Sequence, residues 1–593
     1  MIKNQSRWPH WITRRWALDL SLAFAVLVLY LAWPSQQRSW DGAIQTALDV
    51  TQGHVVVNMR HILYAVAGVP YYAAWKELGY QGDATWPLQV LNALLGAGGI
   101  VFLAELFTRM ARSRWVGMLL ALGLAFSYGY WYFVAETWYN IMALFFLVGA
   151  AGLFFALQAA PRENEPAPRT QQLYVIGIAV AVALAIIADL EHVVSAGVLG
   201  LAILFLLTRL DLRRRIQLAV WYGVTLTALL VAGVVGFGVV LARNDSLPAL
   251  LTWLQPKYLV DDAPMYGAFS LERIPLALTN LGAAILPIER GMRLRLLLSG
   301  TFSADRLIGQ VSLGALALIL ALALFWWIRY VIQVWTARSH RPPWRFRRSA
   351  AGQGDSQSTV TDNHNVRAPI DTQGANAPQG RGRLLLLCLA WVVLIGTFAV
   401  WQDPYSLKRW LPAFIPFGIL LCIPFGDLVA EWRWPRAQAL GALGILGVAS
   451  ILAANLSLAI GPDHNQPNMA FVQGMCTAQH MGKEDLIISS GWDGYTRYLF
   501  LENRKAVQLL ELSAALFGKT PDGPGLAREM DRIIAEARQK GERVWMTDIF
   551  NMDADQWKVV TANTGLTPAN LSKYEREIGW NCQGAIVWEI KGP

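Results

Sequence analysis

Ionisable side chains gather in the short polar segments that separate long apolar stretches of this sequence. The segment at residues 40–61 carries Asp41, Asp49, His54, Arg60 and His61. Later segments carry Glu136, then Asp189, Glu191 and His192, and finally Asp403, Lys408 and Arg409. A carboxylate can take the proton from an attacking hydroxyl, and cations can stabilise a departing phosphate. Carboxylates and cations brought together therefore favour group transfer from a phosphate-bearing donor.

Each of these residues also has a structural interpretation. Asp41 directly follows an apolar run and can serve as a helix cap, while Glu136 lies among aromatic residues typical of a membrane interface. Lys408 and Arg409 can extend from the end of a span toward the interface. The turn ADLEH, residues 188–192, combines carboxylate and imidazole groups that suit a divalent ion, although a solvated turn is the commoner explanation.

The elements that must position these residues are membrane helices. The chain has 593 residues, of which 55% are hydrophobic and 15% charged, whereas soluble domains carry roughly 25% charged residues. Several apolar runs reach the roughly 20 residues that a membrane helix needs. The basic residues behind the net charge of +9 cluster between these runs, which indicates positive-inside topology and lipid headgroups rather than nucleic acid. The sequence therefore predicts an α-helical polytopic membrane protein.

Eleven membrane spans are predicted, and their basic connections set the topology. The spans cover residues 16–33, 86–107, 115–133, 138–158, 174–187, 193–207, 219–241, 309–330, 384–401, 411–430 and 440–460. Basic residues before the first span place the N-terminus in the cytoplasm, so the segments with Asp41, Glu136 and Arg409 face outside. Residues 243–308 are expected to form short interfacial helices. Residues 337–383 lack bulky apolar side chains and are expected to be a disordered cytoplasmic loop.

The tail follows a different pattern from the spans. Strand-length apolar runs at residues 485–490, 543–550 and 585–590 alternate with an amphipathic helix at residues 525–540, which predicts a small α/β domain. We therefore divide the chain into a transmembrane domain, residues 1–460, and an extracytoplasmic domain, residues 461–593. Cys476 and Cys582 both fall in this outer domain, where an oxidising compartment would let them pair. The sequence leaves open whether their Cα atoms come close enough.

Several stretches occur in an order typical of one enzyme superfamily. They are the acid after the first span (Trp40-Asp41-Gly42), HILYAVAGVPYYAAWKELG, WPLQVLNALLGAGGIVFLAELF, VAETWYNIMALFFLVGAAGLFF and, later, SLKRWLPAFIPFGILL. With them, about half of the chain resembles the GT-C superfamily of polyprenyl-phosphate-sugar-dependent glycosyltransferases, especially its protein O-mannosyltransferase-like branch. The resemblance implies a GT-C-like helical fold with an outer C-terminal domain.

The resemblance also implies a reaction and roles for particular residues. The expected enzyme is an inverting hexosyltransferase or mannosyltransferase that moves a sugar from a polyprenyl-phosphate donor to a hydroxyl of a protein or glycan acceptor. Asp41 takes the general-base position and Glu136 the second acidic position, so both are the expected catalytic residues, and Arg409 is placed to meet the donor phosphate. The expected substrate-binding residues are Arg60, His61, His192, Lys408 and Arg409. Relatives often have a second carboxylate after the first, where this chain has Gly42, so a divalent metal (Mg²⁺ or Mn²⁺) remains an open cofactor.

Two other classes of function compete with this interpretation. A membrane transporter or lipid flippase with an accessory outer domain would place ionisable residues at mid-depth and often show inverted repeats, whereas these spans are largely free of such charges. A non-catalytic scaffold would have no lipid-sized groove leading to Asp41. We find no GxxxxGK[ST], GxSxG or CxxC motif, so nucleotide hydrolysis and serine-hydrolase chemistry have no support. The bacterial inner membrane is the expected location, and an endoplasmic reticulum membrane would obey the same topology.

Overall fold

A computed structural model gives the fold of most of the chain. It describes residues 10–36, 46–53, 62–159, 166–240, 270–287, 304–339, 378–404, 406–431, 434–465, 468–491, 495–517, 521–547 and 549–592. Asp41, His54, Arg60 and His61 lie outside the described residues, as do most of the predicted interfacial segment and most of the predicted cytoplasmic loop. The two described edges of that loop are helical, because one helix runs to Ser339 and the next begins at Pro378.

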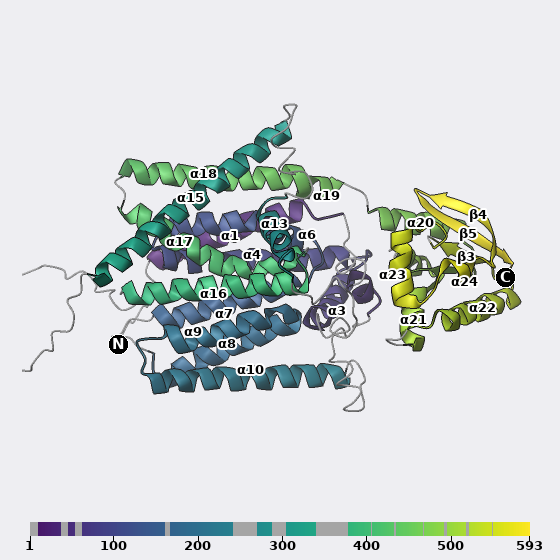
Figure 1. The fold of residues 1–593 in the computed structure, drawn as a ribbon, viewed down its shortest axis with the longest axis horizontal. Coiled ribbons are helices and arrows are strands. Elements are labelled where there is room, and N and C mark those ends of the chain that lie inside the picture. Colours follow the sequence, from purple (N-terminus) through teal and green to yellow (C-terminus); the bar gives the residue numbers. More distant parts are fainter. Residues whose placement is uncertain are drawn as a thin grey trace, which may run out of the picture.

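Long helices lie side by side and make up the larger part of the molecule (Figure 1). They are α1 (His10–Ala32), α4 (Thr85–Ala111), α5 (Arg114–Ala125), α6 (Tyr128–Ala135), α7 (Asn140–Ala159), α8 (Pro168–Ala188), α9 (Val193–Leu206), α10 (Leu212–Val240), α15 (Ala304–Ser339), α16 (Pro378–Gln402), α17 (Phe414–Glu431) and α18 (Trp434–Asn455). Shorter elements at the ends of the bundle are α2 (Leu48–Thr51), α3 (Ile62–Glu77), η3 (Leu190–His192), α13 (Arg273–Ile285), η4 (Leu407–Ala413), η5 (Leu456–Ile460) and α19 (Gly461–Asn465).

The described helices confirm a polytopic membrane protein. Among them, seven are long and apolar enough to cross a membrane, and an eighth crossing results if α5 and α6 form one span. Shorter apolar helices at Ala17–Ala32, Leu190–Leu206 and Ala317–Tyr330 fall on three further predicted spans. Each predicted span thus coincides with an apolar helix, while the number of crossings, eleven, stays a prediction.

Small residues let α4 lie against its neighbours in the bundle. A Cβ added at Gly426 of α17 would overlap the carbonyl oxygen of Ala111 in α4, and one at Gly418 would overlap the ring of Phe107. Such close approach of backbones is the usual way in which membrane helices associate, because lipid offers no hydrophobic force between them. The packing gives α4 a fixed position, which matters because its N-terminal turns carry polar residues of the candidate site.

A sharp break divides the third predicted span into α5 and α6, which are bent by 59° relative to each other. A break frees backbone carbonyls that need donors, since the bilayer core supplies none. Tyr30 donates its hydroxyl hydrogen to the Ala125 carbonyl (2.9 Å), and Asn455 Nδ2 donates to the Phe126 carbonyl (2.7 Å). The same Nδ2 donates to the carbonyl of Ile285 in α13 (3.0 Å). These bonds stabilise the bend, which directs the end of α6 into the site.

The tail contains a five-stranded sheet in the order β2-β1-β3-β5-β4. Its strands are β1 (Leu486–Ser489), β2 (Lys505–Gln508), β3 (Val544–Thr547), β4 (Glu575–Cys582) and β5 (Ala585–Gly592). Strand β1 is parallel to β2 and β3, whereas β5 is antiparallel to β3 and β4. The helices around the sheet are α20 (Met469–His480), η6 (Tyr495–Glu502), α21 (Leu509–Phe517), α22 (Gly523–Gln539), α23 (Ala554–Thr564) and α24 (Pro568–Leu571). The three predicted strands match β1, β3 and β5, and the predicted helix matches α22.

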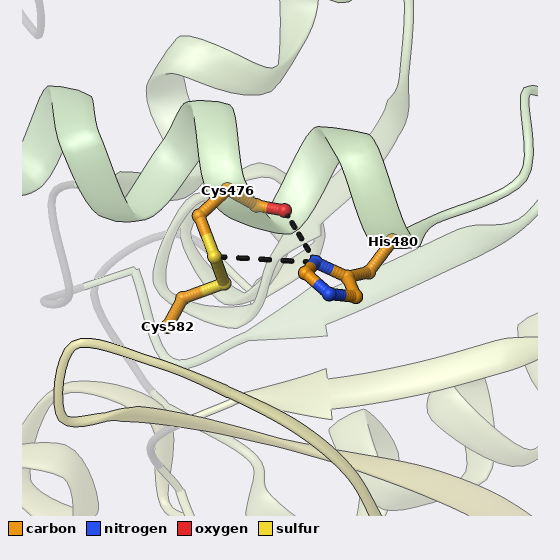
Figure 2. A group of neighbouring side chains, drawn as sticks. All are labelled: Cys476, His480 and Cys582. Carbon is orange, nitrogen blue, oxygen red and sulfur yellow. Dashed lines mark hydrogen bonds between the residues drawn. A yellow bond between two sulfur atoms is a disulfide. The ribbon is translucent and has the colours of Figure 1, made fainter.

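A disulfide joins Cys476 in α20 to Cys582 at the end of β4, with the two Cα atoms 5.8 Å apart (Figure 2). The sequence had left this pairing open, and the structure shows that it forms. His480 lies one helical turn after Cys476, and its Nδ1 donates to the Cys476 carbonyl at 2.9 Å. The link ties α20 to the last hairpin of the tail.

Candidate active site

Polar residues from distant parts of the chain meet at one end of the helical bundle. At this end α1, α6, α8 and α16 terminate, and α4, α7, α9 and α17 begin. It is also the end from which α19 leads into the tail domain, and α3 lies beside it (Figure 1). Because the segments with Glu136, Asp189 and Arg409 all follow helices that terminate here, the predicted topology places them on a single face.

Glu136 follows α6 and has a buried side chain, only 1% exposed. Ser35, just beyond α1, donates its hydroxyl hydrogen to Glu136 Oε1 at 2.7 Å. Gln89 in the first turns of α4 donates from Nε2 to the carbonyls of both Ser35 and Ala135 at 2.8 Å. The segment after α1 is therefore attached to the end of α6 through both a side chain and its backbone.

Asn92, one turn after Gln89, binds the backbone of the segment that begins at Glu136. Its Nδ2 donates to the carbonyls of Glu136 and Trp138, each at 2.8 Å. Glu136 and Trp138 lie between α6 and α7, and their carbonyls require donors of this kind. Asn92 is fully buried, which indicates that it supports this connection rather than contacting solvent.

Asp189 lies directly after α8 and is 2% exposed. Its Oδ2 accepts a hydrogen bond from Asn140 Nδ2 at 2.6 Å, and its Oδ1 accepts one from the backbone N–H of Glu191 at 3.2 Å. Asn140 is the first residue of α7. The carboxyl group of Asp189 thus fixes the ADLEH turn against the start of α7.

Burial raises the pKa of Asp189, while the positive charges of His192, Lys408 and Arg409 oppose that rise. A charge acts strongly on a carboxyl group only when the two are near each other in a poorly solvated setting. The ion pair between Arg409 and Glu191 places the segment with Lys408 and Arg409 beside the ADLEH turn.

Arg409 in η4 has a buried guanidinium group paired with Glu191 of the ADLEH turn. The two side chains are only 4% and 14% exposed. The guanidinium carbon also lies 5.8 Å from the ring centroid of Phe398 in α16, within the range of a cation–π contact. Burial and a carboxylate partner mean that much of the Arg409 charge is already balanced within the protein.

Lys408 is half-buried, and its ammonium group lies among aromatic rings. The Nζ atom donates to the hydroxyl of Tyr139 at 3.0 Å. It lies 5.0 Å from the ring centroid of Trp138 and 5.6 Å from that of Tyr139. An ammonium group has three donors, and the side chain of Lys408 is less buried than that of Arg409. Lys408 is thus better suited than Arg409 to contact an anionic ligand.

The described residues do not support a metal ion held by the ADLEH turn. Among them, the only His, Cys, Asp or Glu trio whose ligand atoms lie within 4.8 Å of one another is Cys476, His480 and Cys582. The two cysteines are consumed by the disulfide (Figure 2), so this trio cannot offer thiolate ligands. Glu191 is engaged with Arg409, and metal dependence stays a prediction.

Some site residues were not found by sequence reasoning. Ser35, Gln89 and Asn140 are uncharged and were not proposed for the site. The two amides could have been found, because an amide inside or at the end of an apolar span needs a hydrogen-bond partner there. His192 is buried, and its Nδ1 has no hydrogen-bond partner among the described residues.

Comparisons with known proteins identify the fold. No protein-family model matches the sequence, and no curated protein matches it. The structure is similar to that of ArnT from Cupriavidus metallidurans bound to undecaprenyl phosphate, with a TM-score of 0.56 and 12% identity over 97% of this chain and 98% of that chain. ArnT in the apo state gives a TM-score of 0.54 and 13% identity, over 98% of each chain. An oligosaccharyltransferase from Archaeoglobus fulgidus in the apo form gives 0.51 and 11%, over 94% of this chain and 73% of that chain.

The chain therefore shares the fold of ArnT and of this oligosaccharyltransferase, which is the GT-C fold that its motifs predicted. The similarity to ArnT extends from the first helix through the tail domain, because it covers nearly all of both chains.

Proposed function

We propose that this protein is an inverting membrane glycosyltransferase that takes its sugar from a polyprenyl-phosphate donor. The observation that carries the proposal is the meeting of buried carboxylates and two cations at one end of a GT-C bundle. ArnT, which shares the fold, has been solved with undecaprenyl phosphate, and this supports a polyprenyl phosphate as the donor's carrier.

In the proposed reaction, an acceptor hydroxyl oxygen attacks the anomeric carbon while the bond from that carbon to the phosphate oxygen breaks. Asp41 takes the hydroxyl proton, and polyprenyl phosphate leaves with the bonding electrons. Gln36, the last described residue before Asp41, precedes it by five positions.

We assign different roles to the site residues that the structure describes. Lys408 contacts the departing phosphate, because its side chain is the less buried of the two cations. Arg409 holds the ADLEH turn through Glu191 and adds positive potential. Glu136 anchors the segment that leads to Asp41 by accepting the hydrogen bond from Ser35. Arg60, His61 and His192 remain proposed substrate contacts.

The active site and the tail domain, residues 461–593, are proposed to lie on the extracytoplasmic side of a bacterial inner membrane. The disulfide between Cys476 and Cys582 supports this side, because disulfides persist in oxidising compartments. The acceptor is a hydroxyl group of a protein or glycan, and Mg²⁺ or Mn²⁺ remains a candidate cofactor.

The test is sugar transfer from a polyprenyl-phosphate sugar by the purified protein and by an Asp41→Asn variant. Loss of a general base lowers turnover by about 10²- to 10⁴-fold. Asp211→Asn, which changes a carboxylate at the opposite end of the bundle, serves as the matched control. Wild-type turnover in the Asp41→Asn variant would refute the proposed base. Lipid translocation without any sugar transfer would favour the flippase interpretation instead.

A further inference from the structure

The short helix α2 connects the bundle to the tail domain. Leu48, 3% exposed, packs against Tyr498 of η6, which is completely buried. The same small cluster includes Ala470, Phe471 and Met475 of α20. The ring of Tyr498 meets that of Phe471 edge-on at 5.5 Å. Leu48 thus lies in an apolar site made by the tail domain, although it belongs to the polar segment between the first two predicted spans.

The opposite side of α2 is fixed to the bundle. Val50 is buried, and its methyl groups fill the space beside Gly68 of α3, where an added Cβ would lie 3.3 Å from Val50 Cγ2. Thr51 Oγ1 accepts a hydrogen bond from the backbone N–H of Ala84 at 2.8 Å, just before α4 begins. Helix α2 therefore joins the tail domain to the helix that carries Gln89 and Asn92.

A second anchor lies at the other end of the same segment. The backbone N–H of Gln36 donates to the carbonyl of Asp463 at 3.1 Å, and His464 Nδ1 donates to the carbonyl of Pro34 at 2.8 Å. Asp463 and His464 belong to α19, which leads from the bundle into the tail domain (Figure 1). Ser35, between Pro34 and Gln36, is the donor to Glu136.

We propose that the tail domain positions the catalytic segment. It holds residues 34–36 through α19 and residues 48–51 through the Leu48 site, and these two anchors bracket the stretch that carries Asp41. This inference rests on the proposed function. Leu48, Tyr498 and His464 are positioning residues, because they act through the placement of the segment rather than on the substrate.

The experiment compares the full-length Leu48→Ala variant with Leu78→Ala, which makes the same change at a side chain that is 84% exposed. In Leu48→Ala we expect amide exchange of residues 46–53 to accelerate by about tenfold or more, since local opening becomes easier when a buried contact is lost. The value of kcat should fall about tenfold, with KM for the polyprenyl-phosphate sugar within about twofold of wild type, because misplacement of a reacting group affects chemistry rather than donor binding. Leu48→Met, which conserves volume, should restore both readouts.

The proposal would be overturned if the Leu48→Ala and Leu78→Ala variants had the same amide exchange rates and the same kcat. Faster exchange with unchanged kcat would show a purely structural contact and would also overturn it. Absence of sugar transfer by the wild-type protein would instead refute the proposed function, and the exchange experiment would still report whether the tail domain holds α2. Combining Leu48→Ala with Met475→Ala should add little to the exchange rate of Leu48→Ala alone, because both remove the same contact.

Discussion

The ion pair between Arg409 and Glu191 allows a direct test of how the two neighbouring cations share the site. The perturbation is Arg409→Met, compared with Lys408→Met and with the double variant Glu191→Met/Arg409→Met. If Arg409 mainly holds the ADLEH turn, its loss should lower stability, whereas the loss of Lys408 should mainly weaken donor binding.

The expected magnitudes follow from burial and charge. The side chains of Arg409 and Glu191 are 4% and 14% exposed. Removing one partner of such a pair leaves an uncompensated buried charge and costs about 3–5 kcal/mol, while replacing both with apolar side chains is close to neutral. A hydrogen bond to a charged group contributes about 1.5–3 kcal/mol. Lys408→Met should therefore weaken binding of the donor about 10- to 150-fold.

The assay measures the thermal unfolding midpoint in detergent together with KM and kcat for a polyprenyl-phosphate sugar. Arg409→Met should unfold at a clearly lower temperature, and the double variant should recover most of the loss. Lys408→Met should unfold near the wild-type temperature and show a raised KM. An Arg409→Met protein of wild-type stability that no longer binds donor would refute this division and would make Arg409 the phosphate ligand.

Three further predictions concern the disulfide, the buried carboxyl group and the helix break. Replacing Cys476 and Cys582 by Ser should destabilise the tail domain by about 2–5 kcal/mol, measured by thermal unfolding; a midpoint equal to that of the oxidised protein would contradict this. Because burial raises the pKa of Asp189, the folded state binds the carboxyl proton more tightly than the unfolded state, so the free energy of unfolding should fall as pH rises from about 3.8 through the raised pKa. The Asp189→Asn variant should lack this fall, and parallel profiles of stability against pH in the two proteins would contradict the prediction. Asn455→Ala leaves two buried carbonyls without their donor and should cost about 1–3 kcal/mol; unchanged stability would mean that other donors hold the break.

The long helices were predictable because an apolar run of membrane length has few alternative structures. The break between α5 and α6 was not, since neither Phe126 nor Ser127 is a residue that ends helices strongly, and its support comes from Tyr30 and Asn455, far away in the chain. Strand β4 was also missed, because its sequence EREIGWNC is mostly exposed and lacks a buried alternating face.

The residue types of the candidate site could be proposed from the sequence, whereas the contacts between these residues could not. Glu136, Lys408 and Arg409 could be named because charged groups beside apolar spans are rare and conspicuous. The partnership of Arg409 with Glu191 could not, because the two residues come from separate loops and spacing does not report such pairs. The link between Leu48 and Tyr498 was equally invisible, since an isolated leucine in a polar segment carries no signal for its partner.

The donors that stabilise the bend between α5 and α6 come from α1 and α18, the first and last long helices described. During synthesis, Tyr30 leaves the ribosome before Phe126 does. Asn455 follows Phe126 by 329 residues, so it emerges much later. The nascent chain must therefore insert most of its helices before the bend gains its second donor. Completion of this bend is consequently a late event in biogenesis, and a chain that stalls before Asn455 would lack one of the two donors that stabilise it.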